Sequence, residues 1–325
     1  MSVYPDNMEA RKIIKFGNSS HVISVPKEWM KENGLKKGDL VFIEKNDGNG
    51  LTLSSKEKKE EKKGRKIIIS GKGKNYKYIE REIVSAYVGG YSTIVLENHG
   101  LQTEDIKSIV SELSGFEMTR KSANEVVIKD ILDIESVSIP SLVRRIDNNV
   151  RGMLEDFGEA IKNKELREKK YKEIYDADGE VNKTYRLALK VLKYGLNNEQ
   201  ILKKSKINPV NAVDIFLLVM TIEHIGDEIK RAARSLKSIK TSNRLAKKVS
   251  GVYSEITDTY YKTMKIYYKK EYEDIYELAI KKPELIEECN AIAKENPSVK
   301  EIMEKLKAIK GWVYQITEYI AFFGK

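Results

Sequence analysis

Two acidic residues in the second half of the chain are spaced so that they can act together. Glu223 and Asp227 are four residues apart, so on a helix they share one face. They follow an apolar run at residues 215–220, which is typical of a helix packed into a core. Carboxylates on one helix face are ligands for a hard cation, provided that a neighbouring helix completes the coordination. The alternative is that both acids pair with the basic side chains that follow, Lys230, Arg231 and Arg234.

Catalytic arrangements of other kinds are not evident in the sequence. A di-iron bundle of the carboxylate type uses Glu-x-x-His pairs, but His21, His99 and His224 have no acidic residue three positions before them. The single cysteine, Cys289, follows two glutamates that would raise the pKa of its thiol, and no Ser-His-Asp set is evident. We therefore expect a protein that is not an enzyme.

Length and composition predict a soluble protein of two or three domains. The 325 residues are 41% hydrophobic and 33% charged, which is typical of a globular chain. One cysteine cannot form an internal disulfide or a cysteine metal cluster, and it fits the reducing cytoplasm. No apolar run approaches membrane-spanning length, and the first seven residues lack the features of a signal peptide. We expect a cytoplasmic protein with no membrane insertion.

The net charge of +10 permits a nucleic acid or another anionic partner. Residues 1–64 contain 13 basic and 10 acidic residues, residues 65–135 contain 10 and 11, and residues 136–325 contain 36 and 28. Because most of the excess lies in the last region, charge alone does not identify the N-terminal region as a DNA reader.

Short strands are predicted for the N-terminal region. Residues 13–16 and 21–26 alternate between apolar and polar around a turn at 17–20, and a helix over 27–33 ends at Gly34. A second hairpin follows, with strands at 40–44 and 51–53 and a turn at 47–50. So few residues cannot bury these strand faces alone, which predicts an intertwined dimer.

This N-terminal region resembles a known family. Residues 15–29, KFGNSSHVISVPKEW, and residues 34–41, GLKKGDLV, are similar to the AbrB/SpoVT DNA-binding domain and its MazE-type antitoxin branch. The resemblance implies a dimeric swapped-hairpin β-barrel that lays basic residues of the first strand and loop against DNA. The residues that it assigns to DNA contact are Arg11, Lys12, Lys15, Asn18, Ser19, His21 and Lys27. The alternative is a fold of this kind that serves only for dimerisation.

A charged linker and a small α/β module are predicted next. Residues 56–66, KEKKEEKKGRK, mix both charge signs, which favours a solvated linker with a boundary near Gly64. Strands at 66–70, 92–97 and 124–128 with helices at 75–88 and 103–113 make a β-α-β-α-β pattern. The Gly71-Lys72-Gly73 stretch lacks the third glycine of a dinucleotide-binding loop, which favours a plain turn. We expect this module to space and couple its neighbours.

Only helices are predicted from Ser136 onward. Apolar residues recur at helical spacing over 140–161, and further helices are expected at 171–196 and 210–237. A second set follows at 243–268, 272–295 with a break at Pro283, and 298–323. Each set alone would leave an apolar face exposed, so we expect two three-helix units packed together. Seven tyrosines within residues 253–276 alternate with lysines and could stack on bases, but half-buried tyrosines of a bundle are favoured.

The helical region resembles PhoU, a phosphate-uptake regulator built from two three-helix repeats. The similarity is greatest at residues 222–229, IEHIGDEI, and extends over residues 136–325. It implies a metal site, divalent or ferric, formed by the acidic motifs of a repeat. The residues that it assigns to this site are Glu223, Asp227, Asp178 and Asn182, the last an asparagine where aspartate is expected. In the second repeat, Glu318 is the one acid of its matching stretch and residues 287–290 are a loose counterpart.

The expected organisation is multidomain. It comprises a DNA-binding domain at 1–55, a linker at 56–64, an α/β module at 65–135 and an all-α bundle at 136–325 with repeats at 136–237 and 243–325. Together these predict a DNA-binding transcriptional regulator of phosphate uptake and phosphate homeostasis. Its expected partners are promoter DNA, a second copy of the chain, and a phosphate transporter ATPase or a signalling protein. The alternative is an adaptor that contacts such a partner without binding DNA.

Overall fold

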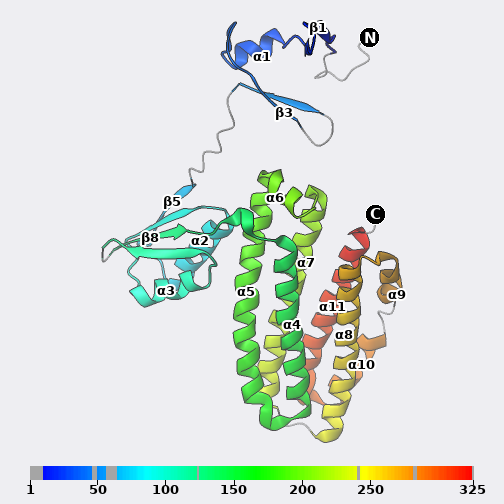
Figure 1. The fold of residues 1–325 in the computed structure, drawn as a ribbon. Helices are drawn as coiled ribbons and strands as arrows, with labels where there is room; N and C mark the ends of the chain where they lie inside the picture. The colour runs from blue at the N-terminus through cyan, green and yellow to red at the C-terminus, as the bar shows by residue number, and fades with distance from the viewer. Residues whose placement is uncertain are drawn as a thin grey trace. The chain divides into compact units, whose positions relative to one another are not determined.

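A computed structural model describes residues 10–45, 50–55, 64–122, 124–239, 242–280 and 284–323. The chain divides into two compact units, Met1–Lys63 and Gly64–Lys325 (Figure 1). Most of the predicted turn at 47–50, the linker residues 56–63 and the predicted helix break at Pro283 lie outside the described residues.

The first unit consists of two hairpins and one short helix. Strands β1 (Ile14–Phe16) and β2 (Ser20–Val22) pair with each other, and α1 (Lys27–Glu32) follows them. Strands β3 (Phe42–Lys45) and β4 (Leu51–Ser54) form the second antiparallel pair. Both hairpins and the helix agree with the sequence prediction. The described residues of the first unit therefore form two separate two-stranded sheets.

Apolar side chains of the first unit are widely exposed to solvent. The exposed fractions are 69% for Phe16, 76% for Leu40 and 63% for Ile43. Ile13 and Leu51 are exposed to a similar extent. An isolated two-stranded sheet has no second layer against which to bury such residues. These strand faces are thus available to a further protein surface.

The second unit begins with a mixed four-stranded sheet covered on one face by two helices. Its elements are β5 (Lys66–Ser70), α2 (Tyr76–Val88), β6 (Thr93–Glu97), α3 (Thr103–Ser111), β7 (Phe116–Arg120) and β8 (Glu125–Asp130). The strand order is β5-β6-β8-β7, with β5 and β6 parallel and the other pairs antiparallel. The sequence predicted three of these four strands and missed β7, which lies at the edge of the sheet. Ile79 and Ile83 of α2 and Ile106 of α3 are fully buried against the sheet.

Long helices make up the rest of the second unit (Figure 1). They are α4 (Ile139–Lys162), α5 (Arg167–Asn197), α6 (Glu199–Lys204), α7 (Pro209–Lys237), α8 (Asn243–Lys269), α9 (Ile275–Ile280), α10 (Glu284–Glu295) and α11 (Lys300–Phe323). The short helix α6 was not predicted, and the predicted helix at 272–295 is α9 and α10. The layout as a whole, with β structure first and an all-helical part last, agrees with the predicted fold class.

Local sequence signals explain where these helices begin. The side chains of Ser138, Asn208 and Ser242 accept hydrogen bonds from backbone N–H groups in the first turns of α4, α7 and α8. Pro140 and Pro209 lie in the first turns of α4 and α7, where no backbone donor is needed. Each of these three helices therefore starts at a residue whose side chain satisfies an otherwise unpaired group.

Helix α7 is the centre of the helical core. It packs against α4, α5 and α11, and its residues Ile222, Ile225 and Ile229 are fully buried. Within the described residues it is also the one helix long and apolar enough to cross a membrane. Its apolar side chains pack in the core of the bundle, and a core helix can be as long and as apolar as a membrane-spanning one. The apolar positions predicted on α4 are buried too, namely Leu142, Val143, Ile146, Val150, Met153, Leu154, Phe157 and Ile161.

Candidate functional site

The residues predicted to contact DNA centre on the first hairpin. Lys15 of β1 is directly opposite His21 of β2, so their side chains lie on the same face of the hairpin. Asn18 and Ser19 lie in the turn between the two strands, and all four residues are exposed. Cationic and polar side chains on a protruding turn can contact phosphate oxygens.

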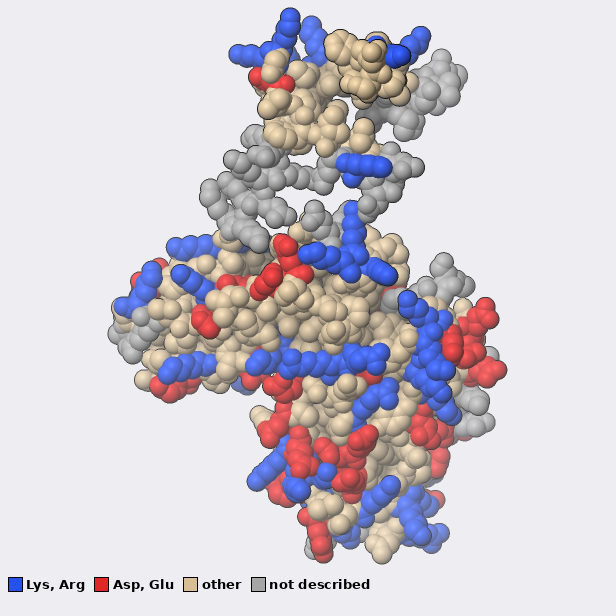
Figure 2. Space-filling model, in the orientation of Figure 1, with Lys and Arg blue, Asp and Glu red and all other residues tan. Residues whose placement is uncertain are grey.

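Three more predicted residues flank this hairpin. Arg11 and Lys12 directly precede β1, and Lys27 is the first residue of α1. All three are exposed. The described part of the first unit contains eight basic and four acidic residues, and on the face drawn in Figure 2 it presents more blue than red. The predicted set thus lies on an exposed, positively charged surface.

The four residues predicted to bind metal are brought to adjacent faces of α5 and α7. Asp178 and Asn182 lie on α5, whereas Glu223 and Asp227 lie on α7. The ammonium Nζ of Lys230 is 2.5 Å from Oδ2 of Asp178 and 2.8 Å from Oδ1 of Asp227. A lysine therefore bridges the two helices at the centre of the predicted site.

Asn182 and Arg231 also pair with the two aspartates of this α5–α7 cluster. The amide Nδ2 of Asn182 donates to Oδ2 of Asp178 over 3.0 Å. Arg231 Nη2 donates to Oδ2 of Asp227 over 3.0 Å, so that this carboxylate has a cation at each oxygen. Asp227 therefore pairs with basic residues that follow it in the chain, which was the alternative to metal binding.

Glu223 has a different environment from the two aspartates. Burial, together with the nearby charges of Asp227 and Asp178, raises its pKa to about 7. The Nε2 atom of the neighbouring His224 lies 3.7 Å from Oε2 of Glu223. The ring of His224 contacts the tilted ring of Trp312 on α11, with ring centroids 4.6 Å apart. The cluster is therefore linked through α7 to the last helix of the chain.

In this structure, the four residues predicted to bind metal do not form a metal site. Within the described ranges, no group of three or more His, Cys, Asp or Glu side chains converges in a way that could hold a metal ion. The oxygens that would coordinate a metal instead accept hydrogen bonds from Lys230, Asn182 and Arg231. An amide N–H and an ammonium are donors without a lone pair to offer a cation.

The loose counterpart in the second repeat has no comparable cluster. Glu287, Glu288 and Glu318 are exposed, whereas Cys289 is buried. Burial is the largest cause that raises the pKa of the Cys289 thiol to about 11, and the charges of Glu288 and Glu304 act in the same direction. A buried thiol of this kind is a weak nucleophile at neutral pH.

A buried acid that was not predicted from the sequence joins α4 to α8. Asp147 of α4 is 1% exposed and accepts hydrogen bonds from Tyr260 (2.7 Å) and Tyr268 (2.9 Å) of α8. Arg151 donates to both of its oxygens over 3.0 Å. Tyr260 is fully buried, whereas Tyr261, Tyr267 and Tyr272 of the same stretch are half-buried, as predicted. The sequence did not single out Asp147, because two of its three donors come from another helix.

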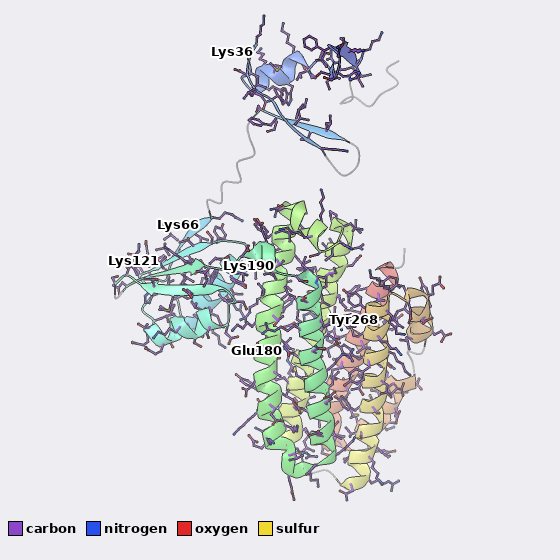
Figure 3. All side chains as sticks on the ribbon, in the orientation of Figure 1. Lys36, Lys66, Lys121, Glu180, Lys190 and Tyr268 are labelled. Carbon is purple, nitrogen blue, oxygen red and sulfur yellow. The ribbon has the colours of Figure 1, made fainter. Side chains whose placement is uncertain are left out.

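A second missed residue joins the α/β module to the bundle. Lys190 of α5 has a side chain that is 1% exposed, and its Nζ lies 2.5 Å from Oδ2 of Asp130 at the end of β8. The same ammonium lies 4.3 Å from the ring centroid of Tyr87 and 4.9 Å from that of Phe116. Figure 3 labels Lys190 on the side of α5 that faces the sheet. The contact fixes α5 against the module.

The glycine loop of the module is a turn, as the sequence favoured. The N–H of Lys74 donates to the carbonyl of Gly71 over 3.0 Å, and Gly73 has a positive φ of 73°. Side chains other than glycine rarely adopt this conformation. Lys74 pairs with Glu82 at 2.7 Å, so its charge is already matched.

These observations define a multidomain chain with a positively charged, strand-exposing N-terminal unit and a charge-paired helical bundle. Comparison with protein-family models identifies two domains in it. Residues 14–69 match the family described as "Antidote-toxin recognition MazE, bacterial antitoxin", and residues 143–236 match the PhoU domain. The chain therefore joins a MazE/AbrB-type domain to a PhoU domain, which confirms the two resemblances drawn from the sequence.

The two family matches cover only part of the chain. The PhoU match covers most of α4 through α7, including the α5–α7 cluster, and ends before α8. Both families are regulatory and neither is a family of enzymes. Searches of curated proteins and of solved structures found no match to the chain. Together the two domains support a regulator connected with phosphate.

Proposed function

We propose that this chain is a cytoplasmic, DNA-binding transcriptional regulator of phosphate uptake. In this proposal the N-terminal unit pairs with that of a second copy and binds promoter DNA. The PhoU domain senses the phosphate state or docks a partner, either a transporter ATPase or a signalling protein. The support comes from the two family matches in one chain and from the charge and exposure of the first hairpin.

The observation that carries the proposal is the combination of exposed apolar strands with exposed basic residues in one small unit. Phe16 and Leu40 are mostly exposed in a single chain, which leaves an apolar surface for the same unit of a second copy. Lys15 and His21 share a face of the first hairpin, beside Asn18 in its turn. A dimer would present two such hairpins, and paired basic elements suit a duplex with two half-sites.

Coupling between the two domains would run through α5. This helix contributes Asp178 to the α5–α7 cluster and Lys190 to the contact with the α/β module. A change in how α5 packs on α7 would therefore alter the module that follows the DNA-binding unit in the chain. We infer that the module transmits the state of the bundle to the N-terminal unit.

DNA binding of the full chain tests the proposal. Promoter DNA of phosphate-transport genes is titrated at several salt concentrations, and the affinity is measured by fluorescence anisotropy. We expect log K to fall linearly with log salt, because phosphate contacts release counterions. For Lys15→Ala we expect weaker binding and a salt slope smaller by about two, one contact from each chain of the dimer.

A matched control separates these contacts from net charge. Lys72 is an exposed lysine of the second unit, so Lys72→Ala removes one charge away from the predicted surface. We expect this variant to bind DNA with the wild-type salt slope. A full chain whose DNA binding is absent, or equal in all three proteins, would argue against DNA contact by the first hairpin.

The second candidate function is an adaptor that binds another protein and no DNA. It is favoured by exposed apolar side chains where α5 ends and α7 begins. Leu196 is 46% exposed, Val210 is 71% exposed and Val213 is 50% exposed. Val210 and Val213 are three residues apart and share a helix face. A chain that binds no DNA but loses a protein partner on Val210→Asp would support this function.

A further inference from the structure

We propose that Lys230 is the resident cation of the α5–α7 cluster, in place of the metal ion that the PhoU resemblance implies. The inference concerns the helical domain alone and does not depend on DNA binding. It follows from the positions of the lysine ammonium and of its partners.

The ammonium of Lys230 lies where a bridging cation would bind. Its Nζ joins a carboxylate of α5 to a carboxylate of α7, at 2.5 Å from Asp178 and 2.8 Å from Asp227. These are the two aspartates that the sequence assigned to the metal. The side chains of Asp178 and Lys230 are 8% and 24% exposed, so the pair is screened less than a surface ion pair.

A metal ion would have to share oxygens that are already occupied. A divalent ion bound to them would lie within about 4 Å of the ammonium, where two cations repel each other strongly in a partly buried site. Arg231 adds another positive charge, 3.0 Å from the second oxygen of Asp227. Asn182 presents its amide nitrogen rather than its oxygen to Asp178. The local charges therefore disfavour a second cation.

The charge of the lysine is itself maintained by the cluster. Burial disfavours the charged form of Lys230, but hydrogen bonds to Asp178 and Asp227 outweigh this effect and raise its pKa. Lys230 and Arg231 together pair with the two aspartates, and Arg231 also pairs with Glu228. Because the cation is covalently part of α7, the cluster can hold α5 and α7 together without any ion from solution.

The test measures metal content and thermal stability of the full chain. Wild type and Lys230→Gln are treated with a chelator, dialysed against Mn²⁺, Fe²⁺ or Zn²⁺, and analysed by mass spectrometry for bound metal. We expect wild type to retain far less than one ion per chain and to melt at the same temperature with metal or chelator. Lys230→Gln is expected to melt about 5 °C lower, because the buried carboxylate of Asp178 and the half-buried carboxylate of Asp227 lose their shared cation.

Two further variants keep the test decisive. Lys230→Arg retains a cation and should recover most of the lost melting temperature. Lys248→Ala removes an exposed lysine that pairs with Glu295, and it should melt within about 1 °C of wild type. A stoichiometric metal in wild type, with a melting temperature that falls on chelation, would overturn the proposal. So would a Lys230→Gln protein as stable as wild type. The metal content of wild type decides the question even where a variant fails to fold.

Discussion

Among the acids of the α5–α7 cluster, Glu223 is distinguished by its lack of a lysine or arginine at ion-pair distance in the described part of the chain. Its side chain is 14% exposed, and burial raises its pKa to about 7 from an ordinary value of 4.5. The charges of Asp227 and Asp178 act in the same direction. This residue therefore links the stability of the fold to pH.

The direction of that effect follows from proton linkage. Between about pH 4.5 and pH 7, folded Glu223 retains a proton that the unfolded chain releases. The contribution of Glu223 to stability is thus greatest below pH 4.5, falls as the pH rises through this window, and is lowest above pH 7. For Glu223→Gln we expect unfolding free energy to increase by about 1–3 kcal/mol at pH 8, with little change at pH 4.5. Urea unfolding at both pH values measures this change in unfolding free energy.

A surface acid on the partner helix provides the control for this prediction. Asp176 is exposed on α5, so Asp176→Asn changes the formal charge equally without removing a buried carboxylate. Its unfolding free energy should stay within about 0.5 kcal/mol of wild type at both pH values. Equal shifts for the two variants would contradict a special role for Glu223.

At the scale of elements, the sequence predicts what local chemistry determines. The long helices were predicted because apolar residues recur every three or four positions along them. Strand β7 was missed because it lies at the sheet edge and is separated from the end of α3, at Ser111, only by residues 112–115. Lys190 and Asp147 were missed because their partners belong to distant elements, which no local pattern encodes.

The same reasoning applies to the candidate site. Asp178, Asn182, Glu223 and Asp227 were identified from sequence, and the fold brings them to adjacent helix faces. What the sequence left open was the cation between them. Lys230 was one of three basic residues near Asp227, and only the packing of α5 on α7 selects it.

The contact between α5 and the module gives a prediction for a whole element. Lys190→Met keeps the length of the side chain but removes the ammonium that pairs with Asp130. We expect a loss of about 3 kcal/mol in unfolding free energy, because the carboxylate of Asp130, which is 14% exposed, loses its buried ammonium partner. Amide hydrogen exchange in β8 should become faster than in α11, which packs on α7, α8 and α10.

A double-mutant cycle checks that the effect belongs to this pair. Asp130→Asn should cost less in the Lys190→Met background than in wild type, with a coupling energy of about 1 kcal/mol or more. Purely additive effects would mean that the two side chains stabilise the protein independently, and that the α5 contact rests on packing alone.

At the scale of the whole molecule, oligomeric state is the property that the first unit predicts. Phe16 and Leu40 are exposed in one chain, and burying them would remove apolar surface from water. We expect the full chain to be a dimer in light scattering after size exclusion. A Phe16→Asp/Leu40→Asp double variant should be a monomer, because a charge on each apolar strand face would have to be buried on association.

An equally exposed residue elsewhere serves as its control. Val210 is 71% exposed at the start of α7, and Val210→Asp should leave the dimer intact. If the double variant remained dimeric and Val210→Asp became monomeric, the dimer would form through the helical part.

The exposed strand faces of the first unit also have a consequence for gene dosage. In the proposed function, the DNA-binding form contains two chains and accumulates in proportion to the square of the chain concentration while most copies are single. Occupancy of a promoter would then respond more steeply to expression level than it does for a DNA-binding domain folded from one chain. Under that proposal, the amount of this protein in a cell would be an input signal in its own right.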